Sequence, residues 1–164
     1  MKVIGIDPGL TGAVAVIGDG AVLVESLPTL EIVKGKRQLD RNGLVQLVVN
    51  VGPIDMVFVE DVHAMPKQGV SSSFNFGRDF GAILGVLAAL GRPITLVQPA
   101  VWKRMLGCPV GAGKDWSRSR AAQLYPSCAD RVARVKDDGR ADAILIAHYG
   151  LLRHGLGIQR WGAA

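Results

Sequence analysis

The sequence has little cysteine and no long apolar run, and each shortage excludes a class of protein. Its two cysteines, Cys108 and Cys128, are too few for a disulfide framework and lack a zinc-ligand spacing. No segment approaches the roughly 18 consecutive apolar residues of a membrane-spanning helix. The first residues, with a single lysine before Asp7, do not resemble a signal peptide. We therefore expect a cytoplasmic protein in a reducing compartment, with no membrane partner.

The remaining composition is typical of a packed domain. The 164 residues are 49% apolar, which is enough to bury a core. No repeat, linker or change of composition divides them. We expect a single domain over residues 1–164, in which residues 155–164 form a frayed tail.

Positive charge is concentrated in one part of the chain. The segment from Gln98 to Arg140 has nine basic and four acidic residues, and nine minus four equals the net charge of +5 of the whole chain. A localised basic region is typical of proteins that bind a polyanion such as nucleic acid. A solvated basic face without a partner would have the same composition, so charge alone leaves both interpretations open.

Hydrophobic periodicity and turn residues predict an α/β domain around a mixed sheet. The predicted strands cover residues 2–7, 13–17, 21–25, 56–60 and 94–97, and Gly18-Asp19-Gly20 joins two of them as a hairpin. The predicted helices cover residues 42–51, with Asn42 as its cap, and 78–90, 99–106, 115–125 and 140–153. The segments 31–41 and 62–76 are predicted to be loops.

Two of the predicted strands end in an acidic residue. Asp7 ends the strand KVIGID, directly before the turn residues PGLTG, and Glu60 ends the strand MVFVE. If the two strands are neighbours, both carboxylates lie at one edge of the sheet, where they repel each other and resist burial. A divalent cation between them would remove both problems.

A third source of acids is the segment KDDGRADAILIAHYG. Asp138 and Asp142 are four residues apart, so their Cβ atoms lie about 5–6 Å apart on one face of a helix. One interpretation is that Asp138 caps the helix and Asp142 benefits from its dipole. That interpretation suits Asp142 less well, because Asp142 lies a turn inside an apolar helix. The other interpretation is that both acids are ligands of a metal ion.

Four carboxylates from three elements suit hard cations, namely Mg²⁺ with Mn²⁺ as a substitute. Two such ions about 3.5–4 Å apart would divide the work of phosphodiester hydrolysis, one generating the attacking hydroxide and the other stabilising the leaving 3′ oxygen. Lys136 and Arg140 flank the acids and are candidates to hold the scissile phosphate. The acids and the basic segment together predict a nuclease.

The motifs GIDPGLTGA, VFVED and DDGRADAILIA, in this order, resemble those of the RuvC-type Holliday junction resolvases, especially phage or prophage members. The resemblance implies a ribonuclease H-like fold, in which helices flank a five-stranded mixed sheet with three antiparallel strands first. It also implies a homodimeric, Mg²⁺-dependent endodeoxyribonuclease with two ions per active site. Such an enzyme would resolve four-way DNA junctions by paired symmetric nicks, in recombination and repair.

The resemblance also implies roles for individual residues. By position, Asp7, Glu60 and Asp142 match catalytic, metal-binding acids of the family. The bacterial family spaces its last acidic pair as Asp-x-x-Asp, whereas here Gly139 occupies the first position and Asp138 lies one residue earlier, with Asp61 and Asp137 as adjacent reserves. The residues that we assign to DNA binding in the basic segment are Lys103 and Lys114, at positions of DNA-contacting lysines, and Arg118, Lys136 and Arg140.

The family's aromatic wedge is missing at its usual place, three residues after the glutamate. His63 occupies that position here. The predicted loop at 62–76 overhangs the site, and its residues Met65, Lys67 and Phe74 are further candidates to enter an opened junction and stack on its bases.

The predicted helix at 78–90 has a stripe of small residues. Gly77, Gly81, Gly85 and Ala89 follow one another at intervals of four. Such a stripe lets another backbone approach closely. It is explained either by tight packing on the protein's own sheet or by a two-fold contact with a second copy, in which Phe80 and Leu84 add apolar bulk.

Three other functions have part of this pattern. A ribonuclease H-like nuclease for flaps or RNA–DNA hybrids would share the acids. A module that binds branched DNA without cutting it would share only the basic region. ATP-binding proteins of the actin and sugar-kinase type have a similar first hairpin, but they enclose their nucleotide between two lobes, and 164 residues supply one. We therefore expect no nucleotide cofactor.

Overall fold

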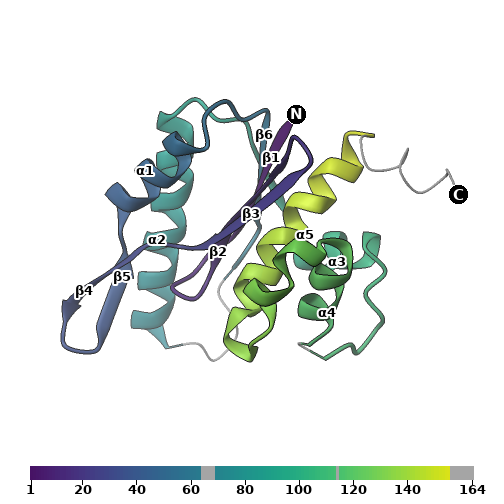
Figure 1. Cartoon of the computed structure of the whole chain (residues 1–164). Helices are drawn as coiled ribbons and strands as arrows, with labels where there is room; N and C mark the ends of the chain where they lie inside the picture. Colours follow the sequence, from purple (N-terminus) through teal and green to yellow (C-terminus); the bar gives the residue numbers. More distant parts are fainter. Residues whose placement is uncertain (64–68, 114, 156–164) are drawn as a thin grey trace, which may run out of the picture.

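A mixed sheet of five strands forms the centre of the protein (Figure 1). The computed structural model describes residues 1–63, 69–113 and 115–155. The sheet has the order β3-β2-β1-β6-β7, in which the first three strands are antiparallel and β6 and β7 run parallel to β1. The strands are β1 (Lys2–Asp7), β2 (Ala13–Gly18), β3 (Ala21–Ser26), β6 (Met56–Glu60) and β7 (Ile94–Val97). This confirms the predicted sheet, with boundaries within one residue.

Helices cover both faces of the sheet, because the central strands β1 and β6 are apolar on both faces. Val3 and Phe58 face a core formed with α3, α4 and α5, whereas Ile4 and Val57 face a core formed with α1 and α2. Figure 1 shows the strands between these two groups of helices. The helices are α1 (Arg41–Asn50), α2 (Val70–Ala89), α3 (Pro99–Met105), α4 (Asp115–Leu124) and α5 (Asp138–Arg153). Within the described residues, no helix has the length and apolar character needed to cross a membrane.

The helix α5 lies directly on the backbone of β1. A Cβ atom at Gly5 would lie 2.3 Å from both the Ala143 carbonyl oxygen and the Ala147 nitrogen. Only glycine permits this approach, since real Cβ contacts are essentially never shorter than 3.0 Å. The packing brings the first turns of α5 to the carboxyl end of β1, where Asp7 lies.

The loop predicted at 31–41 is wrong, because a second, two-stranded sheet occupies most of it. The strands β4 (Thr29–Val33) and β5 (Lys36–Leu39) form a hairpin, and the Glu31 side chain accepts a hydrogen bond from the Gly35 backbone nitrogen in the turn. Most of its side chains are exposed, so the alternation of apolar and polar residues that reveals a half-buried strand is absent. The following helix α1 is capped by Asp40, whose side chain accepts from the Gly43 nitrogen, and not by Asn42.

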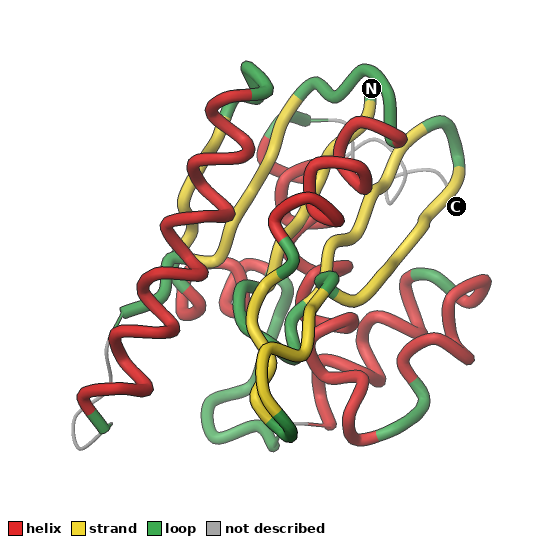
Figure 2. The backbone as a smooth tube through the Cα atoms, turned by 90° about the vertical axis from the view of Figure 1, so that its left-hand side faces the viewer, coloured by secondary structure: helices red, strands yellow, loops and turns green. Residues whose placement is uncertain are grey.

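The long helix α2 begins at Val70, eight residues before the predicted start at Arg78. Its cap, Gly69, makes no side-chain hydrogen bond, so the sequence lacks the usual start signal. The prediction of a loop over 62–76 is therefore wrong from residue 70 onward. The N-terminal turns of α2 extend past the ends of the strands (Figure 2).

The chain between α4 and α5 also has more helical structure than expected. Two 3₁₀ helices, η1 (Pro126–Val132) and η2 (Val135–Asp137), lead directly into α5, which begins at Asp138 and not at Arg140. The frayed tail predicted at 155–164 lies outside the described residues, apart from Gly155.

Candidate active site

Three acids converge at the carboxyl ends of the central strands, and we call Asp7, Glu60 and Asp142 the acid edge. The strands β1 and β6 pair in parallel with Ile6 opposite Val59, so the next residues, Asp7 and Glu60, end neighbouring strands. Asp142 reaches the same place from the second turn of α5. The charges of Glu60 and Asp142 both raise the pKa of Asp7, and the charge of Asp142 raises the pKa of Glu60, which shows that the three acids share one environment.

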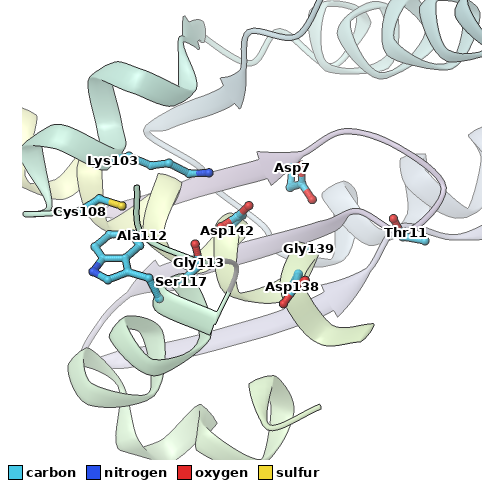
Figure 3. Close-up of a pocket in the computed structure, with 11 residues that line it drawn as sticks. Asp7, Thr11, Lys103, Cys108, Ala112, Gly113, Ser117, Asp138, Gly139 and Asp142 are labelled. Atoms are coloured by element: carbon cyan, nitrogen blue, oxygen red, sulfur yellow. The ribbon is translucent and has the colours of Figure 1, made fainter. Parts of the chain in front are cut away.

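The acid edge borders a hollow of about 420 Å³. Figure 3 shows Asp7, Asp142 and Asp138 around this hollow, with Lys103 of α3 extending toward the first two. Glu60 is 9% exposed and is not among the lining residues, because it lies beneath them against Trp102. The residues that line the hollow are Asp7, Thr11, Lys103, Cys108, Ala112, Gly113, Trp116, Ser117, Asp138, Gly139 and Asp142.

The acid edge is electrostatically unfavourable as it stands. Burial raises the pKa of Asp7 well above its usual range, and the charges of Glu60 and Asp142 raise it further. Burial likewise raises the pKa of Glu60 and of Asp142. Lys103 acts in the opposite direction on all three acids. Buried Glu60 and half-buried Asp7 and Asp142 are therefore opposed in part by Lys103, the one cation among the described residues that lowers the pKa of all three.

The donor set at this edge fits a hard divalent cation. All candidate ligands are carboxylates, which Mg²⁺ and Mn²⁺ prefer. The Asp142 Oδ1 atom is buried without a hydrogen-bond partner, which is costly unless something else contacts it. Across residues 1–63, 69–113 and 115–155, no three His, Cys, Asp or Glu side chains are yet close enough to hold an ion together. Because like charges repel, an ion would have to draw these side chains inward.

The two adjacent acids at the start of α5 have different surroundings. Asp138 lines the hollow, and its Oδ1 atom lies 2.9 Å from Arg118 Nε without hydrogen-bond geometry. Asp137 is 3% exposed and accepts from both the backbone and the guanidinium of Arg134. These bonds hold the pKa of Asp137 below its usual value. Asp138 is thus the acid beside the hollow, and it lies within α5, where it does not cap the helix.

Gly139 explains the departure from the Asp-x-x-Asp spacing. A Cβ atom at this position would lie 2.4 Å from the Thr11 carbonyl oxygen and 2.8 Å from Asp7 Oδ2. The start of α5 therefore rests against the turn between β1 and β2. No side chain fits there, so an acid at residue 139 is excluded, and the neighbouring Asp138 is the one that faces the hollow.

Most arginines of the basic segment are bound within the protein. Arg140 donates to Ser26 Oγ and lies 3.5 Å from Asp137. Arg118 forms ion pairs with Asp115 and Asp138, and its side chain is 13% exposed. Through these contacts, both arginines connect the start of α5 to neighbouring segments of the chain. Their assignment to DNA binding stays a prediction.

The lysines of the segment are more accessible. Lys103 is half-buried in the hollow, and Lys136 is exposed beside the start of α5. Lys114 lies outside the described residues. Lys103 and Lys136 therefore remain candidates for contacts with DNA phosphates.

The wedge candidates are only partly described. Phe74 is 72% exposed, and it lies in the first turns of α2 and not in a loop. His63 is exposed just after β6. Met65 and Lys67 lie outside the described residues. A large aromatic side chain held in solvent on a helix end is suited to stacking on a base.

The small-residue stripe of α2 does not pack on the protein's own sheet. A Cβ atom at Gly77, Gly81 or Gly85 would have nothing within 4 Å, and all three positions are exposed. The opposite side of the helix packs on the sheet through Ile83 and Leu87. Of the two interpretations of the stripe, tight packing on the sheet is wrong.

Sequence reasoning missed two residues that contact the acid edge. The Trp102 indole nitrogen donates to Glu60 Oε1 at 3.0 Å, and the Ser117 hydroxyl lowers the pKa of Asp142. Neither contact could be read from the chain, because α3 and α4 lie far in sequence from β6 and α5. The one available signal was that Trp102 immediately precedes Lys103.

Comparison with known proteins places this site in a known architecture. Over 103 residues the chain is 33% identical to the chloroplastic Holliday junction resolvase MOC1 of Chlamydomonas reinhardtii. The match covers 61% of the chain and 12% of that relative, so the chain spans about an eighth of the relative's length. No family model matches the chain.

Three solved structures show the fold. Thermus thermophilus RuvC superposes with a TM-score of 0.61 at 22% identity, covering 95% of this chain and 98% of that one. The same protein in complex with a Holliday junction substrate gives a TM-score of 0.64 at 20% identity, covering 95% and 97%. The yeast mitochondrial Holliday junction resolvase Ydc2 gives 0.50 at 14% identity, covering 98% and 86%. The chain has the RuvC fold, which confirms the ribonuclease H-like architecture expected from the motifs.

Proposed function

We propose that this chain, which has the RuvC fold and shares sequence with a Holliday junction resolvase, is a Mg²⁺-dependent endonuclease that resolves four-way DNA junctions by paired nicks. The observation that carries the proposal is the convergence of Asp7, Glu60 and Asp142 beside Lys103 at the ends of the central strands. We place the enzyme in a reducing, cytoplasmic compartment, since both cysteines are free thiols.

The chain's own residues divide the task as follows. Asp7, Glu60 and Asp142, with Asp138 beside them, would hold the divalent ions. When bound, such ions activate water and stabilise the leaving oxygen of a phosphodiester. Lys103, which lowers the pKa of all three acids, would contact the scissile phosphate. The exposed Lys136 would contact a neighbouring phosphate of the same strand.

The proposal is tested by incubating the purified protein with a labelled four-way junction, in Mg²⁺ and in EDTA. We expect paired, symmetric nicks in Mg²⁺ and none in EDTA. Nicked flaps or RNA–DNA hybrids, with the junction left intact, would identify a different nuclease of the same fold. Tight junction binding without nicks under any divalent ion would identify a binding module.

We further propose that the protein acts as a homodimer through the glycine stripe of α2. Two observations support this. The stripe formed by Gly77, Gly81 and Gly85 is exposed, a Cβ atom added there would meet no described residue within 4 Å, and half-buried Phe80 and Leu84 lie beside it. A two-fold contact along this helix would direct two acid edges at two symmetry-related strands of a junction.

The dimer is tested with Gly81→Leu, studied by sedimentation at micromolar concentration. A Cβ at residue 81 meets nothing within the chain, so the variant should fold as the wild type does but sediment as a monomer. The matched control is Gln46→Leu, which adds the same side chain at an exposed position of α1 and should remain dimeric. A wild-type protein that sediments only as a monomer would refute the dimer.

A further inference from the structure

Trp102 links the acid edge to the cation beside it. The residue lies on α3 and is fully buried, with 0% of its surface exposed. An indole nitrogen can only donate, so a buried tryptophan needs an acceptor. The acceptor here is Glu60 Oε1, at 3.0 Å from Trp102 Nε1. The largest fully buried side chain of the protein is therefore bonded to a residue of the site.

The hydrogen bond restricts what the Glu60 carboxylate can do. It holds Oε1 against the indole, and in the described part of the chain no hydrogen bond reaches Oε2. A carboxylate held by one oxygen keeps its second oxygen for another contact, in a fixed direction. Partners of this kind orient metal ligands and are as important as the ligands themselves in many sites.

The face of the same indole carries Lys103. The Lys103 Nζ atom lies 5.0 Å from the centre of the ring, within the range of a cation–π contact. Lys103 also acts on the charges of Asp7, Glu60 and Asp142, yet among the described residues it forms no ion pair with any of them. A flexible lysine that faces three acids would be expected to close onto one of them. The contact with the ring instead holds Lys103 beside the carboxylates without an ion pair to them.

We propose that Trp102 is a positioning residue that holds Glu60 through its N–H group and Lys103 through its ring, and so keeps the base of the site open for a divalent cation. The inference rests on the proposed function for its biological meaning. It does not rest on it for its test, because cation binding can be measured without DNA.

The first test separates the N–H group from the ring. Trp102→Phe removes the donor and keeps an aromatic face, whereas Trp102→Leu removes both. We expect Trp102→Phe to weaken Mg²⁺ binding by about 10–100-fold in calorimetric titration of the DNA-free protein. The control is Val132→Ala, which opens the same hydrophobic core in η1 and should lower thermal stability without changing Mg²⁺ affinity.

A spectroscopic measurement adds a signature that loss of packing alone would not produce. In ¹⁵N-labelled protein, the indole resonance that disappears in Trp102→Phe should shift when Mg²⁺ is added. It should also shift in metal-free Glu60→Gln, where an amide oxygen replaces the carboxylate. An indole resonance that is unaffected by both changes would overturn the role of the N–H group.

The role of the ring is tested by nicking at saturating Mg²⁺. Trp102→Leu should nick several-fold more slowly than Trp102→Phe, because Lys103 loses its contact with the aromatic ring, and equal rates would overturn this part of the inference.

If Trp102→Phe binds Mg²⁺ as the wild type does, Trp102 is not a positioning residue, whether or not junctions are cut. If the wild type binds Mg²⁺ and cuts no junction, the proposed function fails and the affinity comparison still decides the role of Trp102. A wild type without Mg²⁺ affinity would overturn both.

Discussion

Two groups of aspartates lie close together in this molecule, and their surroundings shift their pKa values in opposite directions. At the acid edge, Asp7 and Asp142 are half-buried beside other carboxylates, and their pKa values are raised. At the start of α5, Asp137 is buried, but Arg134 and Arg140 surround it and its pKa is lowered. We call Arg134, Asp137 and Arg140 the arginine clamp. The clamp satisfies its buried charge within the chain, whereas the acid edge leaves its charge for something the chain does not supply.

This difference in pairing distinguishes an acid that is paired within the chain from the acids that we propose to bind a metal ion. A buried carboxylate that is fully paired stabilises the fold and has no remaining capacity for a ligand. A buried carboxylate among other carboxylates destabilises the fold, so its presence calls for a reason outside stability. Asp137 and Asp142 are only five positions apart, but Asp137 ends η2 within reach of Arg134 and Arg140, whereas Asp142 lies one turn inside α5.

The largest effect is expected from a substitution of Asp7. Asp7→Asn removes a candidate metal ligand, and metal assistance contributes several kcal/mol to phosphodiester cleavage, so nicking should fall by about a thousandfold or more. Junction binding in EDTA should be unchanged, since no basic residue is altered. The rate of single-turnover nicking checks this, with Asp19→Asn, the same change in an exposed turn, as the matched control. Wild-type nicking by Asp7→Asn would refute the site.

The second change tests the contact between α5 and the acid edge. Gly139→Ala adds a methyl group beside the Thr11 carbonyl oxygen and Asp7 Oδ2, so α5 must move. Displacements of about 1 Å at an active site can cost about a hundredfold in rate, and we expect a loss of that order. The control is Gly150→Ala, which crowds the Phe58 ring at the far end of α5. It should lower stability while the nicking rate of the folded protein is kept, and equal nicking losses in the two variants would contradict this account of Gly139.

The third change removes the carboxylate of the arginine clamp. Asp137→Asn removes the charge that pairs with Arg134 and Arg140, which should lower the free energy of unfolding by about 1–3 kcal/mol. Mg²⁺ affinity should change little, because Asp137 does not face the hollow. Urea unfolding and calorimetric titration measure the two quantities. A variant that loses Mg²⁺ affinity at unchanged stability would make Asp137, and not Asp138, the fourth ligand.

The smallest effect expected is a difference in how the two groups respond to pH. The raised pKa of Asp7 in the folded state means that its favourable contribution is present below its unfolded value of 3.8 and is lost as pH rises above it. The lowered pKa of Asp137 means that its contribution is present above 3.8 and is lost as pH falls. Metal-free Asp7→Asn should therefore gain stability over the wild type as pH rises from 4, whereas the stability that Asp137→Asn lacks relative to the wild type should shrink as pH falls below 4.

Thermal unfolding of the three metal-free proteins between about pH 2 and pH 8 measures these slopes. Added Mg²⁺ should raise the melting temperature of the wild type and leave that of Asp7→Asn nearly unchanged, since binding to the folded state stabilises it. Two variants whose stability differs from the wild type by the same sign at all pH values would contradict the comparison.

Some features of the fold could be predicted because they are local. The central strands were visible as apolar runs, and the hairpin through Gly18-Asp19-Gly20 was visible as turn chemistry. The hairpin of β4 and β5 was missed, because its side chains are exposed and no alternation marks them. The start of α2 was missed because its cap is a glycine without a side-chain bond.

The sequence by itself determined which acids are candidate metal ligands, because an apolar strand that ends in a carboxylate, as at Asp7 and Glu60, is visible without a structure. It also determined the RuvC-like order of motifs. Only the tertiary structure showed that Asp138 and not Asp137 lines the hollow, excluded a side chain at residue 139, and brought the Trp102 indole to Glu60. The physical reason is that burial, repulsion and hydrogen bonding depend on neighbours in space, and α5 and α3 meet the ends of β1 and β6 from distant parts of the chain.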